Sequence, residues 1–247
     1  MSGGKGRRGR AAENGVLVVG AYLADREHLA VEISAELGRG RRWSVDQRWV
    51  AVGSSPVPPA LLAVTAWRSS TPRPKFDVLS QLLREVDRRG HRYLLLCDDD
   101  VRLPDGFVDR YLELVERHDL ALAQPARTHG SFIDHPFVEQ LDGIDARLTR
   151  FVEIGPLVSI RRDAVRHLVP FDPRSPMGWG LDFSWPVRME RAGLRMGIVD
   201  AVPVAHDLRP PAAHYDRAQA ASAMRAHAER TPHLTRDEAF TILEAWS

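Results

Sequence analysis

The sequence contains very little cysteine, since Cys97 is the only one among 247 residues. A single cysteine excludes an intrachain disulfide and a cysteine-based zinc cluster, and it agrees with a reducing compartment. No apolar run approaches the length of about 20 residues that a membrane-spanning helix requires. No apolar segment of signal-peptide length follows the basic start either. We therefore expect a cytoplasmic protein without a membrane span.

Positive charge is concentrated at the start of the chain. The formal net charge is +1, yet residues 1–14 carry four basic side chains against Glu13 alone. Such a glycine-rich basic stretch cannot bury apolar surface, so we expect residues 1–14 to form a disordered tail. A contact with nucleic acid or an anionic membrane is the alternative. No basic stripe interleaved with aromatic residues follows in the body, so we expect no nucleic-acid partner.

The remaining sequence alternates short apolar runs with amphipathic patterns of helical period. This alternation predicts an α/β fold, in which a central, mostly parallel, doubly wound sheet is flanked by helices. Strands are expected at residues 16–20, 43–52, 93–97, 120–123, 151–160, 196–199 and 202–205. Helices are expected at residues 27–37, 76–86, from 104, 163–168, 182–192, in the alanine-rich stretch after 210, and from 235.

Three consecutive aspartates, Asp98, Asp99 and Asp100, follow the strongest strand candidate. Carboxylates this close repel and raise one another's pKa unless a cation or hydrogen bonds compensate. In open α/β sheets, ligands bind beyond the carboxyl ends of the strands. Asp98 and Asp100 share one side of an extended segment, and hard oxygen ligands suit Mg²⁺ or Mn²⁺. The alternative is an acidic turn before the helix that Pro104 opens, although one aspartate would suffice for that.

The segment GWGLDF, residues 178–183, is a second concentration of unusual residues. Its glycines let the backbone turn tightly beside a bulky ring, so Trp179 and Gly180 could offer a face to a sugar. Asp182 could act as a general base toward an acceptor hydroxyl or simply cap the following helix. His206 ends a short apolar run and is either a structural histidine or, beside a carboxylate-bound metal, a further metal ligand.

These segments, in this order, resemble the GT-A glycosyltransferases, and within them a family of uncharacterised GT-A-like domains of plants and bacteria. The resemblance rests on residues 93–125, on FVEIGPLVS at 151–159, and on GWGLDF with GIVDA at 197–201 and His206. It implies a single GT-A-like, Rossmann-like domain over residues 15–247. The expected parts of that domain are a nucleotide-sugar-binding half (15–125), an acceptor and catalytic half (126–209) and C-terminal helices (210–247).

The resemblance also implies an activity. The protein is expected to be a metal-dependent, hexosyltransferase-like, inverting enzyme that uses Mn²⁺ or Mg²⁺. It would move a sugar from a nucleoside-diphosphate donor, assumed to be a UDP-sugar, to an acceptor hydroxyl. The implied metal ligands are Asp98, Asp100 and His206, the donor contacts include Asp98 and Asp99, and Asp182 takes the place of the catalytic base.

Other donor contacts are less defined. Residues 50–55 lack the aspartate that reads the base in such enzymes, so Tyr22 is expected to stack on the base instead. Lys75 is expected to reach the diphosphate, with a solvated surface lysine as the alternative. Arg209 or His214 would close over the phosphates as a lid, and residues 127–150 would recognise the acceptor.

Two other functions remain open. A sugar nucleotidyltransferase would begin with a glycine- and arginine-rich phosphate loop, which residues 20–25 do not resemble. A non-catalytic nucleotide- or carbohydrate-binding module on the same fold is the second alternative. The donor sugar, the acceptor and a homo-oligomeric state are left open by the sequence.

Overall fold

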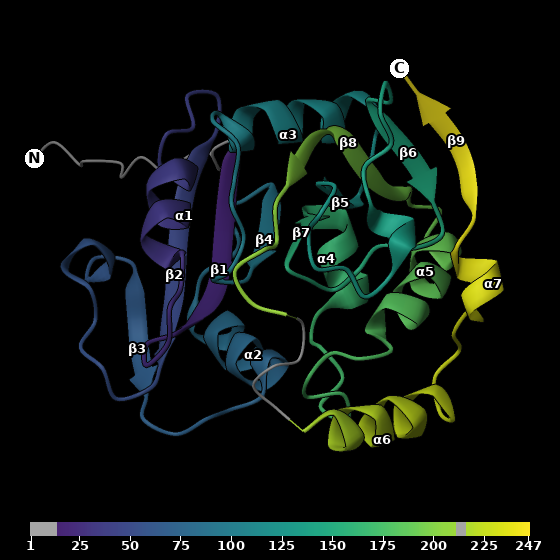
Figure 1. Cartoon of the computed structure of the whole chain (residues 1–247). Helices are drawn as coiled ribbons and strands as arrows, with labels where there is room; N and C mark the ends of the chain where they lie inside the picture. The colour runs from purple at the N-terminus through teal and green to yellow at the C-terminus, as the bar shows by residue number, and fades with distance from the viewer. Residues whose placement is uncertain (1–13, 211–215) are drawn as a thin grey trace, which may run out of the picture.

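The centre of the structure is a mixed β-sheet. The computed structural model describes residues 14–210 and 216–247, and in these ranges nine strands form one sheet in the order β3-β2-β1-β4-β7-β5-β8-β6-β9 (Figure 1). The pairings give all strands one direction except β6 and β7, so the sheet is mostly parallel. The strands are Gly15–Leu23 (β1), Ser44–Val52 (β2), Thr65–Ser69 (β3), Tyr93–Cys97 (β4), Leu122–Arg127 (β5), Ala146–Thr149 (β6), Leu157–Arg161 (β7), Met196–Val204 (β8) and Ile242–Trp246 (β9).

Helices cover both faces of this sheet. The buried side chains of α1 and α3 pack in one core cluster, and those of α2, α4 and α5 pack in a second. The helices are Ala30–Leu37 (α1), Lys75–Glu85 (α2), Phe107–Arg117 (α3), Arg162–Leu168 (α4), Leu181–Arg191 (α5), Arg217–Ala228 (α6) and Arg236–Ala239 (α7), with 3-10 turns at Pro59–Leu61 (η1) and Pro136–Val138 (η2). The predicted α/β class, with a mostly parallel central sheet flanked by helices, is confirmed.

Strand β4 shows how the sequence produces this layering. Tyr93, Leu95 and Cys97 belong to the first cluster, whereas Leu94 and Leu96 belong to the second. Successive side chains of a strand point to opposite faces, and a strand buried on both faces is apolar throughout. The all-apolar run therefore places β4 in the interior of the sheet, between β1 and β7.

A third, smaller core is rich in aromatic rings and is formed by residues from the second half of the chain. Phe151 lies 5.4 Å from Phe183 and 4.8 Å from Phe240 between ring centroids. Val138 and Ile198 belong to the same cluster. These contacts tie the segment before β7 to the start of α5 and to the C-terminal part of the chain.

The C-terminal part differs from the expectation of helices alone. The capping box of Thr235 and Glu238 is confirmed, but α7 ends at Ala239 and the chain continues as β9, which pairs with β6. Strand β3 was also not predicted from the sequence. Both are the edge strands of the sheet (Figure 1), and their side chains are largely exposed or half-buried, so they lack the apolar run of a central strand.

Two strand boundaries also differ. The expected strands at 196–199 and 202–205 form one strand, β8, because the intervening Asp200 is buried and its carboxylate pairs with Arg147 at 2.9 Å. The expected strand at 151–160 begins only at Leu157. The predicted N-terminal tail falls outside the described residues apart from Asn14. Among the described helices, none combines the length and the apolar character needed to cross a bilayer.

Candidate functional site

The acidic turn and His206 come together through strand pairing. Asp98 to Asp100 follow the carboxyl end of β4, and His206 follows the carboxyl end of β8. Arg102, two residues after Asp100, and Ala205, the residue before His206, exchange backbone hydrogen bonds of 2.8 and 3.2 Å. This antiparallel bridge holds the two segments side by side at the carboxyl edge of the sheet, where open α/β sheets bind ligands.

Asp100 and His206 form the closest pair among the predicted metal ligands. The Nε2 atom of His206 lies 3.4 Å from Oδ2 of Asp100. Burial disfavours the charged imidazole, but the hydrogen bond with Asp100 and the negative charges of Asp100 and Asp98 together outweigh this and raise the pKa of His206. Burial also acts to raise the pKa of Asp100, but His206 and Arg209 outweigh it and the pKa is lowered. In the structure as described, these opposite charges stabilise each other.

The rest of the imidazole is held by the loop before β6. Nδ1 of His206 lies 3.3 Å from the carbonyl oxygen of Phe132, and its backbone N–H donates to the hydroxyl of Ser131 at 3.1 Å. An Nδ1–H that donates to a carbonyl leaves Nε2 as the nitrogen that can bind a metal. Ser131 and Phe132 were not singled out from the sequence, because only the folded loop brings them near residue 206.

Arg209 neutralises the other side of the acidic turn. Its guanidinium pairs with Asp99, lies 3.0 Å from Oδ2 of Asp100, and donates to the carbonyl oxygen of Glu27 at 2.7 Å. Asp99 is buried and also accepts a hydrogen bond from the backbone N–H of Leu23 at 2.7 Å. Burial raises the pKa of Asp99 to about 6 even beside this guanidinium. Asp99 thus ties the acidic turn to the end of β1. The other lid candidate, His214, lies outside the described residues.

Asp98 points to a different partner. Its carboxylate pairs with Nζ of Lys75, at the start of α2, at 2.6 and 2.8 Å. Gly155 packs against this pair, since a Cβ there would lie only 2.8 Å from Nζ and 3.0 Å from Oδ2 of Asp98. The sequence left open whether Lys75 is a solvated surface residue. In the structure it contacts the acidic turn through Asp98. The two cations Lys75 and Arg209 flank the carboxylates.

Two of the three predicted metal ligands, Asp100 and His206, are placed to bind one divalent cation. Among the described residues, no group of three or more His, Cys, Asp or Glu side chains is arranged to hold a metal. The predicted set of Asp98, Asp100 and His206 is therefore not assembled, because Asp98 is engaged by Lys75. Asp100 and His206 do offer one oxygen and one nitrogen close together. Such a pair suits a hard cation whose remaining ligands are waters and substrate phosphates.

Asp182 is buried at the start of α5. Gly180, with φ of 89°, is the N-cap residue of this helix, so Asp182 is not its cap. The Asp182 side chain is 8% exposed, and its Oδ1 has no hydrogen-bond partner among the described residues. Burial raises the pKa of Asp182 to about 7, against the opposing effect of nearby backbone amides. A buried carboxyl with a pKa near neutrality suits a general base.

The glycine before Trp179 is required by packing. Gly178 has φ of 87°, and a Cβ there would lie 2.3 Å from the ring of Phe76 and 2.6 Å from Ile154. Trp179 is half-buried, and its carbonyl oxygen accepts a hydrogen bond of 2.7 Å from Ser175. Gly178 thus brings the turn that bears Trp179 against the start of α2 and the segment before β7.

Glu153 and Arg127 were not identified from the sequence. Arg127 is 1% exposed, and its guanidinium lies 3.1 Å from Oε2 of Glu153. Burial raises the pKa of Glu153 to about 7, Arg127 opposes this, and the charge of Asp182 adds to it. The sequence does show one charged residue in or next to each of two apolar segments, which is unusual. Because the two residues are far apart in the sequence, it could not predict that they pair.

Tyr22 is not placed to stack on a base. It is fully buried in the core cluster under α1, and its hydroxyl lies 3.1 Å from that of Thr65. The ring also contacts His28 at 5.0 Å between centroids. Tyr22 lies on the side of β1 that faces the core, and in this structure its ring is a packing element.

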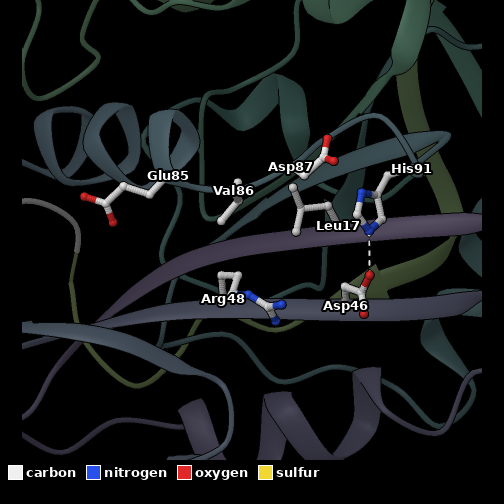
Figure 2. A pocket seen from close by; sticks show the side chains of 8 residues that line it. Leu17, Asp46, Arg48, Glu85, Val86, Asp87 and His91 are labelled. Carbon is white, nitrogen blue, oxygen red and sulfur yellow. Dashed lines mark hydrogen bonds and ion pairs between the residues drawn. The ribbon is translucent and has the colours of Figure 1, made fainter.

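A pocket of about 420 Å³ lies elsewhere in the molecule (Figure 2). Asp46 and His91 line it and form an ion pair of 2.7 Å, with Arg48 nearby. These residues lie near the amino ends of β2 and β4, at the edge of the sheet opposite the acidic turn. The pocket is therefore separate from the candidate site.

The raised pKa of Asp182 predicts how the free energy of unfolding depends on pH. Carboxyls in the unfolded chain ionise near pH 4, whereas Asp182 in the folded protein holds its proton until about pH 7. Between these values the folded state binds more protons, so this contribution to the free energy of unfolding is lost as pH rises. The Asp182→Asn variant should gain stability relative to wild type from about pH 4 to 7, by up to about 1.4 kcal/mol per pH unit. Urea unfolding across this range measures it; parallel pH profiles of the two proteins would contradict it.

The fold was compared with known proteins. No family model and no curated protein sequence matches the chain. Among solved structures, S. aureus TarS 1-349 in complex with UDP-GlcNAc superposes with a TM-score of 0.58 at 10% identity, over 85% of this chain and 64% of that one. GalNAc-T7 with UDP, GalNAc and Mn2+ gives 0.58 at 10% identity, over 86% and 48%. A mycobacterial protein gives 0.52 at 16% identity, over 82% and 70%.

These likenesses concern architecture. The chain spans less than two thirds of the length of the TarS fragment and about half of GalNAc-T7. At such low identities, the superposition shows a shared fold. The sheet order, the helices on both faces and the agreement with these glycosyltransferases lead to the same conclusion: this chain has the GT-A glycosyltransferase fold.

Proposed function

We propose that this protein is a metal-dependent, inverting glycosyltransferase that moves a sugar from a nucleoside-diphosphate donor to an acceptor hydroxyl. The observation that supports this most is the meeting of Asp100 and His206, 3.4 Å apart, at the carboxyl edge of a GT-A sheet. The charge of the buried carboxyl Glu153 interacts with both Asp182 and His206, which supports a base in the same region as the acidic turn.

The donor is proposed to bind across the acidic turn. Two cations lie beside the carboxylates, Lys75 and Arg209. Each could pair with a donor diphosphate and neutralise part of its negative charge. Asp100 and His206 would hold Mn²⁺ or Mg²⁺, and such a cation stabilises the charge that develops on the leaving diphosphate. Two of the similar structures contain UDP-GlcNAc, or UDP with Mn2+, which favours a UDP-sugar as the donor.

Asp182 is proposed to remove the acceptor proton. As a base it would accept the proton of the attacking hydroxyl while the acceptor oxygen bonds to the anomeric carbon and the diphosphate leaves. Attack from the face opposite the leaving group inverts the anomeric centre. The half-buried ring of Trp179 would pack against a sugar, next to the backbone of Gly180. Residues 127–150 would recognise the acceptor.

A ligand screen followed by a turnover assay tests this proposal. The screen measures Tm with UDP, GDP and ADP, each with and without Mn²⁺. A nucleotide at 100 times its Kd should stabilise the protein by about 2.7 kcal/mol, a rise in Tm of about 5–10 °C for a domain of this size. We expect the largest rise with UDP and Mn²⁺ together.

The turnover assay measures UDP release from a panel of UDP-sugars. Slow release to water, accelerated by a hydroxyl acceptor, is the expected result. Binding of UDP without release from any donor would instead indicate a nucleotide-binding module. Failure of every nucleotide to raise Tm would contradict the proposed site itself.

A further inference from the structure

A second carboxyl lies beside the proposed base. Glu153 is 9% exposed, and its Oε1 has no hydrogen-bond partner within the described ranges, although Oε2 is held by Arg127 at 3.1 Å. Asp182 has the same property, with Oδ1 buried and without a partner there. An ionised carboxylate oxygen accepts hydrogen bonds, so each of these atoms can take a donor from a ligand.

The two carboxyls belong to segments that are packed together. Phe151, two residues before Glu153, contacts Phe183, the residue after Asp182, at 5.4 Å between ring centroids. Ile154 lies against Gly178 in the same turn that leads to Asp182. The charges of Glu153 and Asp182 repel one another, and Asp134 repels both. The two carboxyls therefore lie on segments that pack together, in an acidic part of the molecule.

Resting on the proposed glycosyl transfer, we propose that Glu153 binds the acceptor together with Asp182, and that the acceptor presents two neighbouring hydroxyl groups. One hydroxyl donates to Asp182 and is the attacking group. The second donates to Oε1 of Glu153 and orients the first. The acceptor class is thus a carbohydrate or other polyol with a vicinal diol, rather than a molecule with one isolated hydroxyl. Glu153 is a positioning residue, and Arg127 keeps its carboxylate in place.

A matched pair of model acceptors tests this assignment. UDP release from the donor that wild type hydrolyses fastest is measured with cis-1,2-cyclohexanediol and with cyclohexanol. We expect wild type to have a kcat/KM at least about tenfold higher for the diol, the contribution of one hydrogen bond to a charged group. In Glu153→Gln, which keeps an oxygen for Arg127, that preference should disappear through a higher KM for the diol. The kcat/KM for cyclohexanol, which has no second hydroxyl for Glu153, should fall far less than that for the diol.

Two further variants serve as controls. Glu190→Gln removes an exposed carboxylate that pairs with Arg150, and it should keep the diol preference. Glu153→Asp keeps a carboxylate on a shorter side chain, so it should keep only part of the diol preference. If Glu153→Gln melts at a clearly lower temperature, this partial loss in Glu153→Asp is the result that tests the proposal.

The outcomes separate the two proposals. Equal loss with both alcohols in Glu153→Gln, or no diol preference in wild type, overturns the role of Glu153. UDP release to water without acceleration by either alcohol also overturns it, while leaving glycosyl transfer intact. Absence of UDP release from every donor overturns glycosyl transfer, and the role of Glu153 with it.

Discussion

Replacing Asp182 by asparagine should lower sugar transfer by about 10²–10⁴-fold, the range that a general base contributes. The substitution keeps the shape of the side chain and removes its ability to take a proton. An asparagine oxygen can still accept hydrogen bonds from the backbone amides around Asp182, and Gly180 remains the N-cap residue, so we expect α5 to keep its start. UDP binding, measured by the rise in Tm, should stay near the wild-type value.

The matched control is Asp163→Asn. Asp163 is the second residue of α4, as Asp182 is of α5, but its carboxylate is half-exposed and pairs with Arg161 at 2.9 Å. This variant should transfer sugar at the wild-type rate. Equal loss of UDP binding and transfer in Asp182→Asn would show that Asp182 has a structural role instead.

Replacing Asp100 by alanine should remove the part of the UDP-induced Tm rise that depends on Mn²⁺. Changes in groups that merely support metal ligands cost about 10–100-fold in affinity or activity, so loss of a ligand should reduce donor turnover by at least about 100-fold. The fold should suffer little, because Arg209 still pairs with Asp99 after the change. His206 loses its partner, and its pKa should fall.

Asp207→Ala is the control for this variant. Asp207 adjoins His206 in the sequence, but its carboxylate is half-exposed and pairs with Arg102 at 2.9 Å rather than with Asp100 or His206. It should keep the Mn²⁺-dependent Tm rise. A wild-type response to Mn²⁺ in Asp100→Ala would mean that the cation binds elsewhere.

The sequence was sufficient to place the acidic turn. The apolar run 93–97 could only be a strand buried on both faces, and three aspartates at its end require compensation. That reasoning placed the acidic turn at the carboxyl edge of the sheet, where the structure brings Lys75, Arg209 and His206 beside it. Edge strands β3 and β9 lacked such a signal, because exposed strands need no apolar run.

The partners of the site residues could not be predicted in the same way. Asp98 was expected beside Asp100 on a metal, but the structure pairs it with Lys75, at the start of α2. Arg127 and Glu153 pair across 26 residues. Such contacts depend on how α2 packs beside β4, and how β5 packs beside the segment before β7, and local periodicity contains no information about either. For the same reason, a buried Tyr22 looked like an accessible ring.

Anomalous diffraction from crystals grown with UDP and Mn²⁺ tests the central claim most directly. We predict a manganese peak in contact with both Asp100 and His206, with the diphosphate of UDP on the same ion and Lys75 or Arg209 beside it. A manganese or UDP position away from the acidic turn, for example in the pocket of Asp46 and His91, would contradict the proposed site.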